Sequence, residues 1–403
     1  MGWVRRIPAQ GQFKYVLLMT LLLRVDCLRT TIAESLRPFY GASDQSARRA
    51  TRILHPRPST SGDQKQDNGP DEIHIPDMLK DVIVEAIEDL GGGKVKEVRE
   101  TTPGPGLHSR HFRYTATGGT FLAKVSKRMA KEDSFAAERA GLEAILRAGC
   151  LRAPRPLTHG RLPLGGSFLL MEFLPFIPFG QSIPEVLKHL AEGLAAMHLR
   201  DAPDGVEGFG FTQDNLLGIS SQDNSWKADF ATFMVENRLL PQFERAQGKF
   251  SDKYGTSNED ALAFRSMGSQ VFNRAREVLA ELEDAKPCLL HGDLWVGNCG
   301  GLPTEGRGRE AAVFDPACWY GVHEFDLALA TMFGGFGVPF YEVYHSIIPK
   351  AEGFDRRMRF YKLYHYLNHL NQHGAGFGHG GSMENPKGYY ERCVGLMQDI
   401  IAD

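Results

Sequence analysis

Two spacings of apolar residues divide this chain into helical and extended segments. Helical spacing covers residues 77–90, where acidic side chains come early and three glycines end the pattern, and it returns at 134–146. Short apolar runs typical of strands predominate at about 95–122, and a further run ends at Leu174. This pattern predicts a small β-rich lobe over residues 75–174.

The second part of the chain carries the longer helical patterns. Ser182 opens a helix whose apolar residues fall on one face, and residues 355–373 carry another such face. Short strand-like runs occur at 287–290 and 311–314. We therefore predict an α+β, bilobal fold in which a larger, mainly helical C-lobe over 175–403 follows the β-rich N-lobe.

Composition places the chain among globular proteins. It has 403 residues, 42% of them apolar and 24% charged, with a net charge of −3. This length supports a sizeable core, and the charge balance has no basic bias, so we expect no nucleic-acid partner. The six cysteines form no CxxC pair and no metal-ligand spacing, which is typical of reduced thiols.

The segment over residues 1–74 differs from the rest. Arg5 and Arg6 precede an apolar run over 13–23 that is shorter than a bilayer-spanning helix and similar to the core of a signal peptide. Residues 1–62 contain ten Lys or Arg and three Asp or Glu, which gives a charge of +7. The part after the apolar run is rich in Arg, Ser and Thr and poor in acids, as transit peptides are.

A signal-like core followed by transit-like sequence predicts a two-part address to a plastid. A mitochondrial or cytoplasmic location is the alternative, and the free cysteines disfavour a secreted or membrane-anchored protein. We expect no stable membrane span in the mature form. Residues 59–72 have no apolar side chain to bury and are expected to be disordered, so the folded part begins near Ile75.

The strongest chemical signal lies in the second half of the chain. Residues 291–298 read His-Gly-Asp-Leu-Trp-Val-Gly-Asn, and the run at 311–314 leads into Asp315. Asp293 can orient and deprotonate an acceptor hydroxyl, while Asn298 and Asp315 offer hard oxygen ligands for the Mg²⁺ that bridges ATP phosphates. Each residue alone is typical of a turn. The two motifs in this order, each after a strand-like run, predict phosphoryl transfer from Mg-ATP.

A kinase also needs a cationic clamp for the phosphates upstream of these motifs. Lys124 is embedded in a short apolar strand-like run, which suits a side chain reaching the α- and β-phosphates. The helical segment that follows offers Glu138 or Glu143 as its ion-pair partner. We predict that Glu138 is the partner and that Glu143 is a solvated neighbour.

The nucleotide is expected to be held at two further places. Gly104 and Gly106 lie between strand-like segments, where glycine lets backbone N–H groups approach phosphate oxygens, although Gly-Pro-Gly is also common in ordinary turns. Glu172, Phe173 and Leu174 end a buried strand before a proline-rich linker. Their backbone groups are predicted to hydrogen-bond adenine.

Taken together, these motifs resemble the fructosamine-3-kinase (ketosamine-3-kinase) family, small-molecule kinases related to the aminoglycoside and choline phosphotransferases. The resemblance runs from about Leu79 to the C-terminus. The segments that carry it lie at residues 135–138, 141–144, 154–156, 165–172, 209–226, 290–295, 314–317, 320–321, 332–336 and 363–369. It implies a protein-kinase-like bilobal fold with ATP and Mg²⁺ as cofactors.

The resemblance also implies the role of each motif residue. Asp293 is then the base, Asn298 and Asp315 hold Mg²⁺, and Lys124 with Glu138 is the ion pair that positions the phosphates. Glycine-rich loops of this family often carry a cysteine where Leu107 stands here, so control through a thiol in that loop is not expected. His323 stands where related bacterial sequences tend to have arginine, so acceptor recognition is expected to differ in detail.

Candidates for the acceptor site are aromatic and polar residues of the C-lobe. Trp226 and Trp295 can stack on sugar carbons, and either could equally be packing. His323 and Glu324 are candidate sugar-binding residues, and Glu324 and Asp326 have core bracing as the rival interpretation.

Three histidines of the C-terminal helical segment follow one another at helical spacing. His365, His369 and His373 fall at i, i+4 and i+8 without the carboxylate of an HExxH motif. A structural or acceptor-site role is therefore favoured over metal binding.

The sequence thus predicts an ATP-dependent kinase, and the resemblance implies that its substrates are ketoamines. These are sugar adducts of free or protein-bound amines, phosphorylated on the third sugar carbon so that the adduct becomes unstable and leaves. The alternatives are a kinase of the aminoglycoside or choline type and a nucleotide-binding regulator without turnover. A regulator would usually have lost one of the four residues Lys124, Asp293, Asn298 and Asp315, and all four are present.

Overall fold

The computed structural model describes ten stretches of the chain. They are residues 77–101, 109–126, 134–163, 165–177, 183–206, 208–248, 258–303, 309–333, 336–374 and 388–403. The predicted targeting segment and the predicted glycine-rich loop with Gly104 and Gly106 lie outside these residues.

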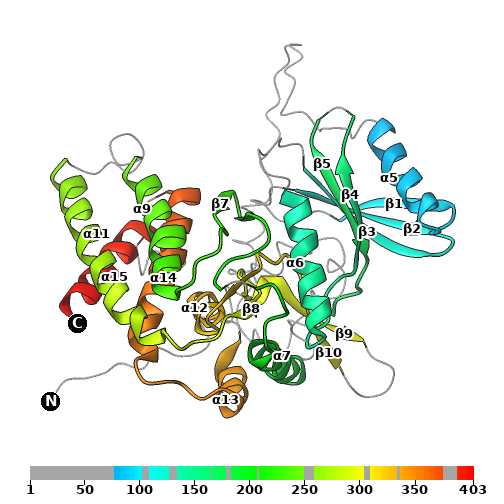
Figure 1. Cartoon of the computed structure of the whole chain (residues 1–403). Helices are drawn as coiled ribbons and strands as arrows, with labels where there is room; N and C mark the ends of the chain where they lie inside the picture. Colours follow the sequence, from blue (N-terminus) through cyan, green and yellow to red (C-terminus); the bar gives the residue numbers. More distant parts are fainter. Residues whose placement is uncertain are drawn as a thin grey trace, which may run out of the picture.

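An antiparallel sheet of five strands forms the N-terminal part. Its strand order is β1-β2-β3-β5-β4. The strands are β1 (Val95–Thr101), β2 (Arg110–Ala116), β3 (Gly119–Ser126), β4 (Pro156–Arg161) and β5 (Ser167–Glu172), and the helices are α5 (Asp77–Asp89) and α6 (Ser134–Ala148). Figure 1 shows α5 against one side of the sheet and α6 on the side that faces the rest of the molecule.

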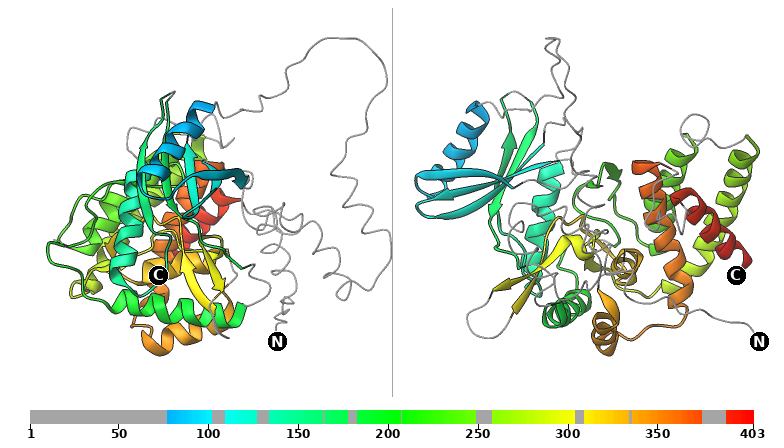
Figure 2. Two further views of the ribbon diagram at one scale, coloured as in Figure 1. Left: turned by 90° about the vertical axis from the view of Figure 1, so that its right-hand side faces the viewer. Right: turned by 180° about the vertical axis from the view of Figure 1, so that it is seen from behind.

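Helices dominate the rest of the chain, as predicted for the C-lobe of an α+β fold. They are α7 (Ile183–Leu199), α8 (Phe230–Thr232), α9 (Leu240–Gln247), α11 (Asn258–Leu279), α12 (Glu324–Met332), α13 (Gly337–Ile347), α14 (Phe354–His373) and α15 (Tyr389–Ala402), with the π-helical turn η2 (Phe233–Leu239) and the 3-10 turns η3 (Ala280–Leu282) and η4 (Val296–Asn298). The view from behind, on the right of Figure 2, also shows the sheet at one end and the C-terminal helices at the other.

Three short antiparallel strand pairs lie between these helices. They are β6 (Asn215–Leu217) with β7 (Ser220–Gln222), β8 (Cys288–Leu290) with β11 (Trp319–Gly321), and β9 (Cys299–Pro303) with β10 (Arg309–Val313). The first strand of the β8–β11 pair leads into the 291–298 motif, and β10 leads into Asp315. The two motifs predicted from the sequence therefore leave neighbouring strand pairs.

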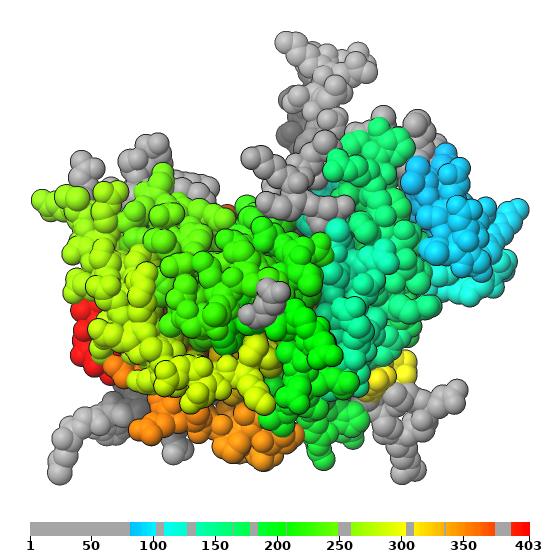
Figure 3. Space-filling model, viewed as in Figure 1, coloured from blue at the N-terminus to red at the C-terminus, as the bar shows by residue number. Residues whose placement is uncertain are grey.

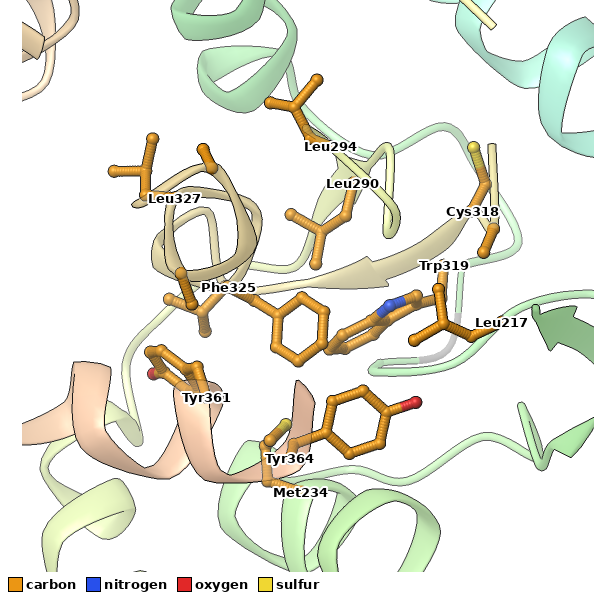
Figure 4. Close-up of a cluster of buried hydrophobic side chains, with 14 of the residues drawn as sticks. Leu217, Met234, Leu290, Leu294, Cys318, Trp319, Phe325, Leu327, Tyr361 and Tyr364 are labelled. Atoms are coloured by element: carbon orange, nitrogen blue, oxygen red, sulfur yellow. The ribbon is translucent and has the colours of Figure 1, made fainter. Parts of the chain in front are cut away.

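Each part of the molecule has its own apolar core. The sheet and α5 share a small core around Ile87, Phe112 and Leu170. The large core under the helices centres on Trp319, which is fully buried and meets Phe325 edge to face with ring centroids 4.8 Å apart. Figure 4 shows these two rings beside Tyr361 and Tyr364 of α14.

The predicted helices and strands agree closely with this architecture. The three glycines after α5 do end that helix, and Gly91 has a φ of 76°, a conformation that glycine adopts without strain. In the space-filling view of Figure 3 the described residues between 77 and 172 gather on one side and most of the later residues lie on the other. Among the described residues, no helix is both long enough and apolar enough to cross a bilayer.

Candidate active site

The loop after β8 brings Asp293 and Asn298 into direct contact. The side-chain amide of Asn298 donates to the carboxylate oxygen Oδ2 of Asp293 and to its backbone carbonyl, both at 2.9 Å. These two bonds fix the rotamer of Asp293. They also leave the amide oxygen of Asn298 turned away from that carboxylate, because the amide nitrogen is the donor.

Asp293 has an unusual electrostatic environment. Burial, together with the nearby carboxylates of Asp315 and Asp326, raises its pKa to about 7, against the effect of the Asn298 hydrogen bond and of Lys124. A carboxylate whose pKa lies near neutrality is a better proton acceptor than an ordinary aspartate. The raised pKa of Asp293 is therefore compatible with the predicted role of a general base.

Asp326 is hydrogen-bonded to the backbone at the start of this loop. Its two carboxylate oxygens accept the backbone N–H of His291 at 2.7 Å and that of Gly292 at 2.8 Å. The ring of His198, on α7, lies 3.2 Å from the same carboxylate. Because Asp326 is itself fully buried, it anchors the start of the catalytic loop to the core of the C-lobe.

Gly292 makes this close packing possible. Its φ is 79°, and a Cβ atom at this position would lie 2.0 Å from the backbone oxygen of Ala317. A larger residue would therefore both strain the backbone and push the loop away from the segment that follows Asp315.

Lys124 joins the sheet to both motifs. It lies on β3 and pairs with Glu138 of α6, with 2.5 Å between Nζ and Oε1, and it also pairs with Asp315. Burial alone would lower the pKa of Lys124, but the two carboxylates raise it above its ordinary value. The lysine is thus charged although only 4% of its surface is exposed.

The structure also shows which of the two candidate glutamates pairs with Lys124. Glu143 pairs with Arg139 at 2.8 Å and is partly exposed, whereas Glu138 turns toward the sheet. The predicted Lys124–Glu138 ion pair is present, and Glu143 is the solvated neighbour.

Asp315 is placed as a metal ligand would be. It is the only non-glycine among the described residues with a positive φ, 56°, a strained conformation of the kind found at functional sites. The backbone N–H of Phe314 donates to the backbone oxygen of Asn298 at 3.0 Å, so the two predicted ligands lie close to the same end of the β9–β10 pair, Asn298 just before β9 and Asp315 just after β10. Although burial would raise the pKa of Asp315, Lys124 lowers it below its ordinary value. A partly exposed carboxylate and an amide oxygen fit a Mg²⁺ that keeps several waters.

The predicted adenine segment connects β5 to the C-lobe. The carboxylate of Glu172 is held by the guanidinium of Arg152 and by the backbone N–H of Arg155, so only its backbone is available for a nucleotide. Leu174 is buried beside Phe176 and Leu302. The backbone N–H of Phe173 donates to Thr120 at 3.3 Å, and a hydrogen bond to adenine by Phe173 would therefore use its carbonyl.

The four predicted acceptor residues do not lie together. Trp295 is partly exposed, between Asp293 and Asn298 along the chain, and its indole lies against the backbone of Gly297. Trp226 is also partly exposed and packs against Tyr320, with 6.2 Å between ring centroids. These two residues remain candidates for sugar contacts.

Glu324 requires a correction, because its carboxylate is engaged in the core. Arg357 donates to both of its oxygens at 2.7 and 2.9 Å, Tyr361 donates at 3.3 Å, and only 1% of the residue is exposed. A buried, fully paired carboxylate cannot bind a sugar. Glu324 braces the start of α12, which was the rival interpretation of the sequence.

His323 is likewise turned inward. Its ring nitrogen Nδ1 lies 3.1 Å from the hydroxyl of Tyr344, which also contacts His198 at 2.8 Å. Burial lowers the pKa of His323 to about 3, so its ring is neutral at physiological pH. This position contributes to the network behind Asp326 rather than to a cationic acceptor site.

Arg238 is a buried cation that sequence patterns did not reveal. Its guanidinium lies 4.5 and 4.6 Å from the ring centroids of Phe233 and Trp319, which stack on each other, and it donates to the Asn224 side chain at 2.5 Å. It thereby fixes the loop that carries Trp226. No local signal marks it, because an arginine on a helix is ordinarily solvated.

The five-stranded sheet, the helical C-lobe and the residues joined by Lys124 define a phosphotransferase of the protein-kinase-like fold. The chain belongs to the fructosamine kinase family, whose sequence profile matches residues 78–384.

Three similar proteins illustrate this relationship. The chain is 35% identical over 301 residues to the chloroplastic protein-ribulosamine 3-kinase of Arabidopsis thaliana, covering 74% of this chain and 85% of that protein. The crystal structure of a putative fructosamine-3-kinase from Thermobifida fusca YX-ER1 is 26% identical, covers 80% of this chain and 99% of its own, and has a TM-score of 0.61. An aminoglycoside phosphotransferase in a ternary complex with ADP and hygromycin B shares the fold, with a TM-score of 0.52 at 19% identity over 79% of this chain and 97% of its own.

Proposed function

We propose that the protein transfers the γ-phosphate of ATP to a sugar hydroxyl of a ketoamine, the adduct of a sugar with a free or protein-bound amine. One observation carries this proposal. The contacts of Lys124 with Glu138 and Asp315 bring a phosphate-binding cation to the Asp293–Asn298 loop within a chain of the fructosamine kinase family.

Each site residue is proposed to have its own role in phosphate transfer. Asp293 orients the acceptor hydroxyl and takes its proton as the bond to phosphorus forms. Asn298 and Asp315 would hold Mg²⁺, which supplies charge neutralisation at the phosphates. Lys124 contacts Asp315, and we propose that it also reaches the α- and β-phosphates of ATP.

Adenine is proposed to bind the backbone of Glu172, Phe173 and Leu174, because the side chain of Glu172 is already paired with Arg152. Gly104 and Gly106 stay a prediction for the phosphate-covering loop. Trp295 is proposed to stack on the sugar, since it is partly exposed within the catalytic loop.

Phosphate is proposed to go to the third sugar carbon, in keeping with the names of the plant relatives. Phosphate is a much better leaving group than hydroxide. Loss of a proton from the first sugar carbon and of phosphate from the third leaves a C=N bond to the amine, and water hydrolyses this bond to release the free amine and a dicarbonyl sugar fragment. The activity would therefore be deglycation.

The test is a comparison of acceptors. Purified protein with ATP and Mg²⁺ should transfer labelled phosphate to fructosyl-lysine or ribulosyl-lysine and not to choline or kanamycin. Transfer to choline or kanamycin alone would move the protein to another acceptor class. ATP binding without transfer to any of these acceptors would favour a regulator.

We also propose that the protein acts in a plastid. The basic, acid-poor segment after the apolar run at 13–23 supports this location, and two plant relatives carry the word chloroplastic in their names. A fluorescent fusion of residues 1–70 should enter plastids. A diffuse cytosolic signal, or retention at the surface membrane, would contradict the proposal.

A further inference from the structure

A histidine lies next to Lys124 on the five-stranded sheet. Strands β2 and β3 pair in antiparallel register, with His111 directly opposite Lys124. Side chains of directly opposite residues point to the same face of a sheet, with Cβ atoms about 5 Å apart. The next pair in the register, Phe112 and Ala123, points to the other face and joins the small core that the sheet shares with α5. His111 therefore shares the face from which Lys124 contacts Asp315.

The charges of the motif residues act on this histidine. Burial, together with the charge of Lys124, lowers the pKa of His111 to about 4, against the effect of Asp315. The imidazole is therefore neutral at pH 7 and carries one N–H. A neutral ring can lie beside Lys124 without repelling it, and its N–H can still donate to an anion.

The two ring nitrogens of His111 have different surroundings. Nε2 lies 3.2 Å from the hydroxyl of Ser109, which can donate to it. Within the part of the chain that the structure describes, Nδ1 has no hydrogen-bond partner. When the Ser109 hydroxyl donates to Nε2, the single ring proton is on Nδ1, and this N–H can bond to a ligand.

A ligand at this face of the sheet reaches His111 more easily than Lys124. Only 4% of Lys124 is exposed, and its ammonium group is paired with the carboxylates of Glu138 and Asp315. His111 is partly exposed. Because one lysine charge is shared by two carboxylates, the site has little positive charge left for a polyphosphate. A further donor beside Lys124 would strengthen the binding of such an anion.

The position of His111 along the chain points to the same ligand. Gly104 and Gly106 of the predicted phosphate-covering loop lie just before Ser109 and His111 in the sequence. Phosphates held between that loop and Lys124 would pass His111. The phosphate chain of ATP is longer than the spacing of a directly opposite residue pair, so one nucleotide can contact both side chains.

We infer that His111 is a second phosphate-binding side chain of the nucleotide site, which donates its Nδ1–H to the phosphate chain of ATP beside Lys124. This inference rests on the proposed kinase function. It adds a nucleotide contact that the sequence motifs did not indicate.

The experiment measures nucleotide binding to the purified protein without an acceptor. Dissociation constants for ATP, and for adenosine, which has no phosphate, are obtained by competition against a fluorescent ATP analogue. A hydrogen bond to a charged group that is partly exposed contributes at the lower end of its usual range, so His111→Ala should weaken ATP binding roughly tenfold. It should change adenosine binding less than about twofold, since adenosine makes no phosphate contact.

Three further variants complete the design. His111→Asn keeps an amide donor close to the position of Nδ1 and should retain most of the ATP affinity. His111→Leu keeps the bulk of the side chain without a donor, and it should reproduce the loss even if His111→Ala folds poorly. His159→Ala removes another partly exposed histidine of the same sheet, on the edge strand β4, and should change the binding of neither nucleotide.

The outcomes separate the two claims. Equal losses for ATP and adenosine, unchanged ATP binding in both His111→Ala and His111→Leu, or a His111→Asn variant that binds ATP as weakly as these two would each overturn the phosphate contact. A wild-type protein that binds no ATP would overturn the proposed function, and the contact with it.

Discussion

Asp326 offers a direct test of how the catalytic loop is held in place. In the variant Asp326→Asn one carboxylate oxygen becomes an amide nitrogen, which cannot accept a hydrogen bond. One of the backbone N–H groups of His291 and Gly292, now bonded at 2.7 and 2.8 Å, is then left buried without an acceptor, and the other bond loses its charge assistance.

The size of the effect follows from these two bonds. A hydrogen bond to a charged group contributes roughly 1.5–3 kcal/mol, and a buried donor without an acceptor costs about 1–3 kcal/mol. We expect the free energy of unfolding to fall by about 3–5 kcal/mol. Because the loop carries Asp293, we also expect kcat to fall roughly 10²-fold, the cost of misplacing a reacting group by about 1 Å.

Urea unfolding followed by circular dichroism measures the first quantity, and steady-state kinetics at a temperature where the variant is folded measures the second. The control is Asp284→Asn, an exposed acid that precedes β8 in the sequence. It should change neither the free energy of unfolding nor kcat. ATP affinity should stay within a few-fold, since Lys124 and Asp315 are untouched. A loss of stability below about 1 kcal/mol together with near-normal kcat would refute the anchoring role of Asp326.

Three further predictions concern single groups. Asp293→Asn should lower kcat by roughly 10² or more with ATP binding nearly intact, and near-normal turnover would remove it from the role of base. Asp315→Ala should abolish the Mg²⁺-dependent part of ATP affinity, measured by titrating ATP with and without Mg²⁺; an unchanged Mg²⁺ effect would count against it as a ligand. Burial lowers the pKa of His365 to about 3, so the unfolded chain binds a proton there below about pH 6.5 and the folded chain does not. Stability should therefore fall as pH drops from about 6.5 toward 3, and His365→Phe should remove about 1.4 kcal/mol per pH unit of that slope in urea titrations between pH 4 and 6. An identical slope in both proteins would show that His365 is protonated when folded.

The helices and strands were predictable because their signals are local. Each signal lies inside the element that it predicts or directly beside it. Examples are the apolar residues on one face of α7 and the glycines that follow α5. The same holds for the contact between Asp293 and Asn298, which a single loop brings together. Glu138 and Glu143 are five positions apart, so they point in different directions from α6 and only one of them can pair with Lys124.

Other parts of the site were not predictable from any local pattern. Glu324 was a candidate for sugar binding with core bracing as the rival, and the buried Arg357 on α14 supplies the partner that decides for bracing. His323 was a candidate because related bacterial sequences tend to have arginine at this position, and Tyr344 of α13 holds its ring inward. In both cases the partner lies on an element whose approach depends on the whole C-lobe.

The sequence by itself determined the order of the elements, the chemical types of the reacting groups and the family of the chain, since each depends on residues close together or on motif order. Only the tertiary structure decided which charges meet. Lys124 reaches Asp315 across 191 positions, and Asp326 binds a loop more than thirty residues upstream. Burial then determines the pKa values of these charged groups. A buried carboxylate near other charges has a shifted pKa and needs a hydrogen-bonding or ionic partner. How far water is excluded from it depends on the packing of the whole domain, which no short stretch of sequence contains.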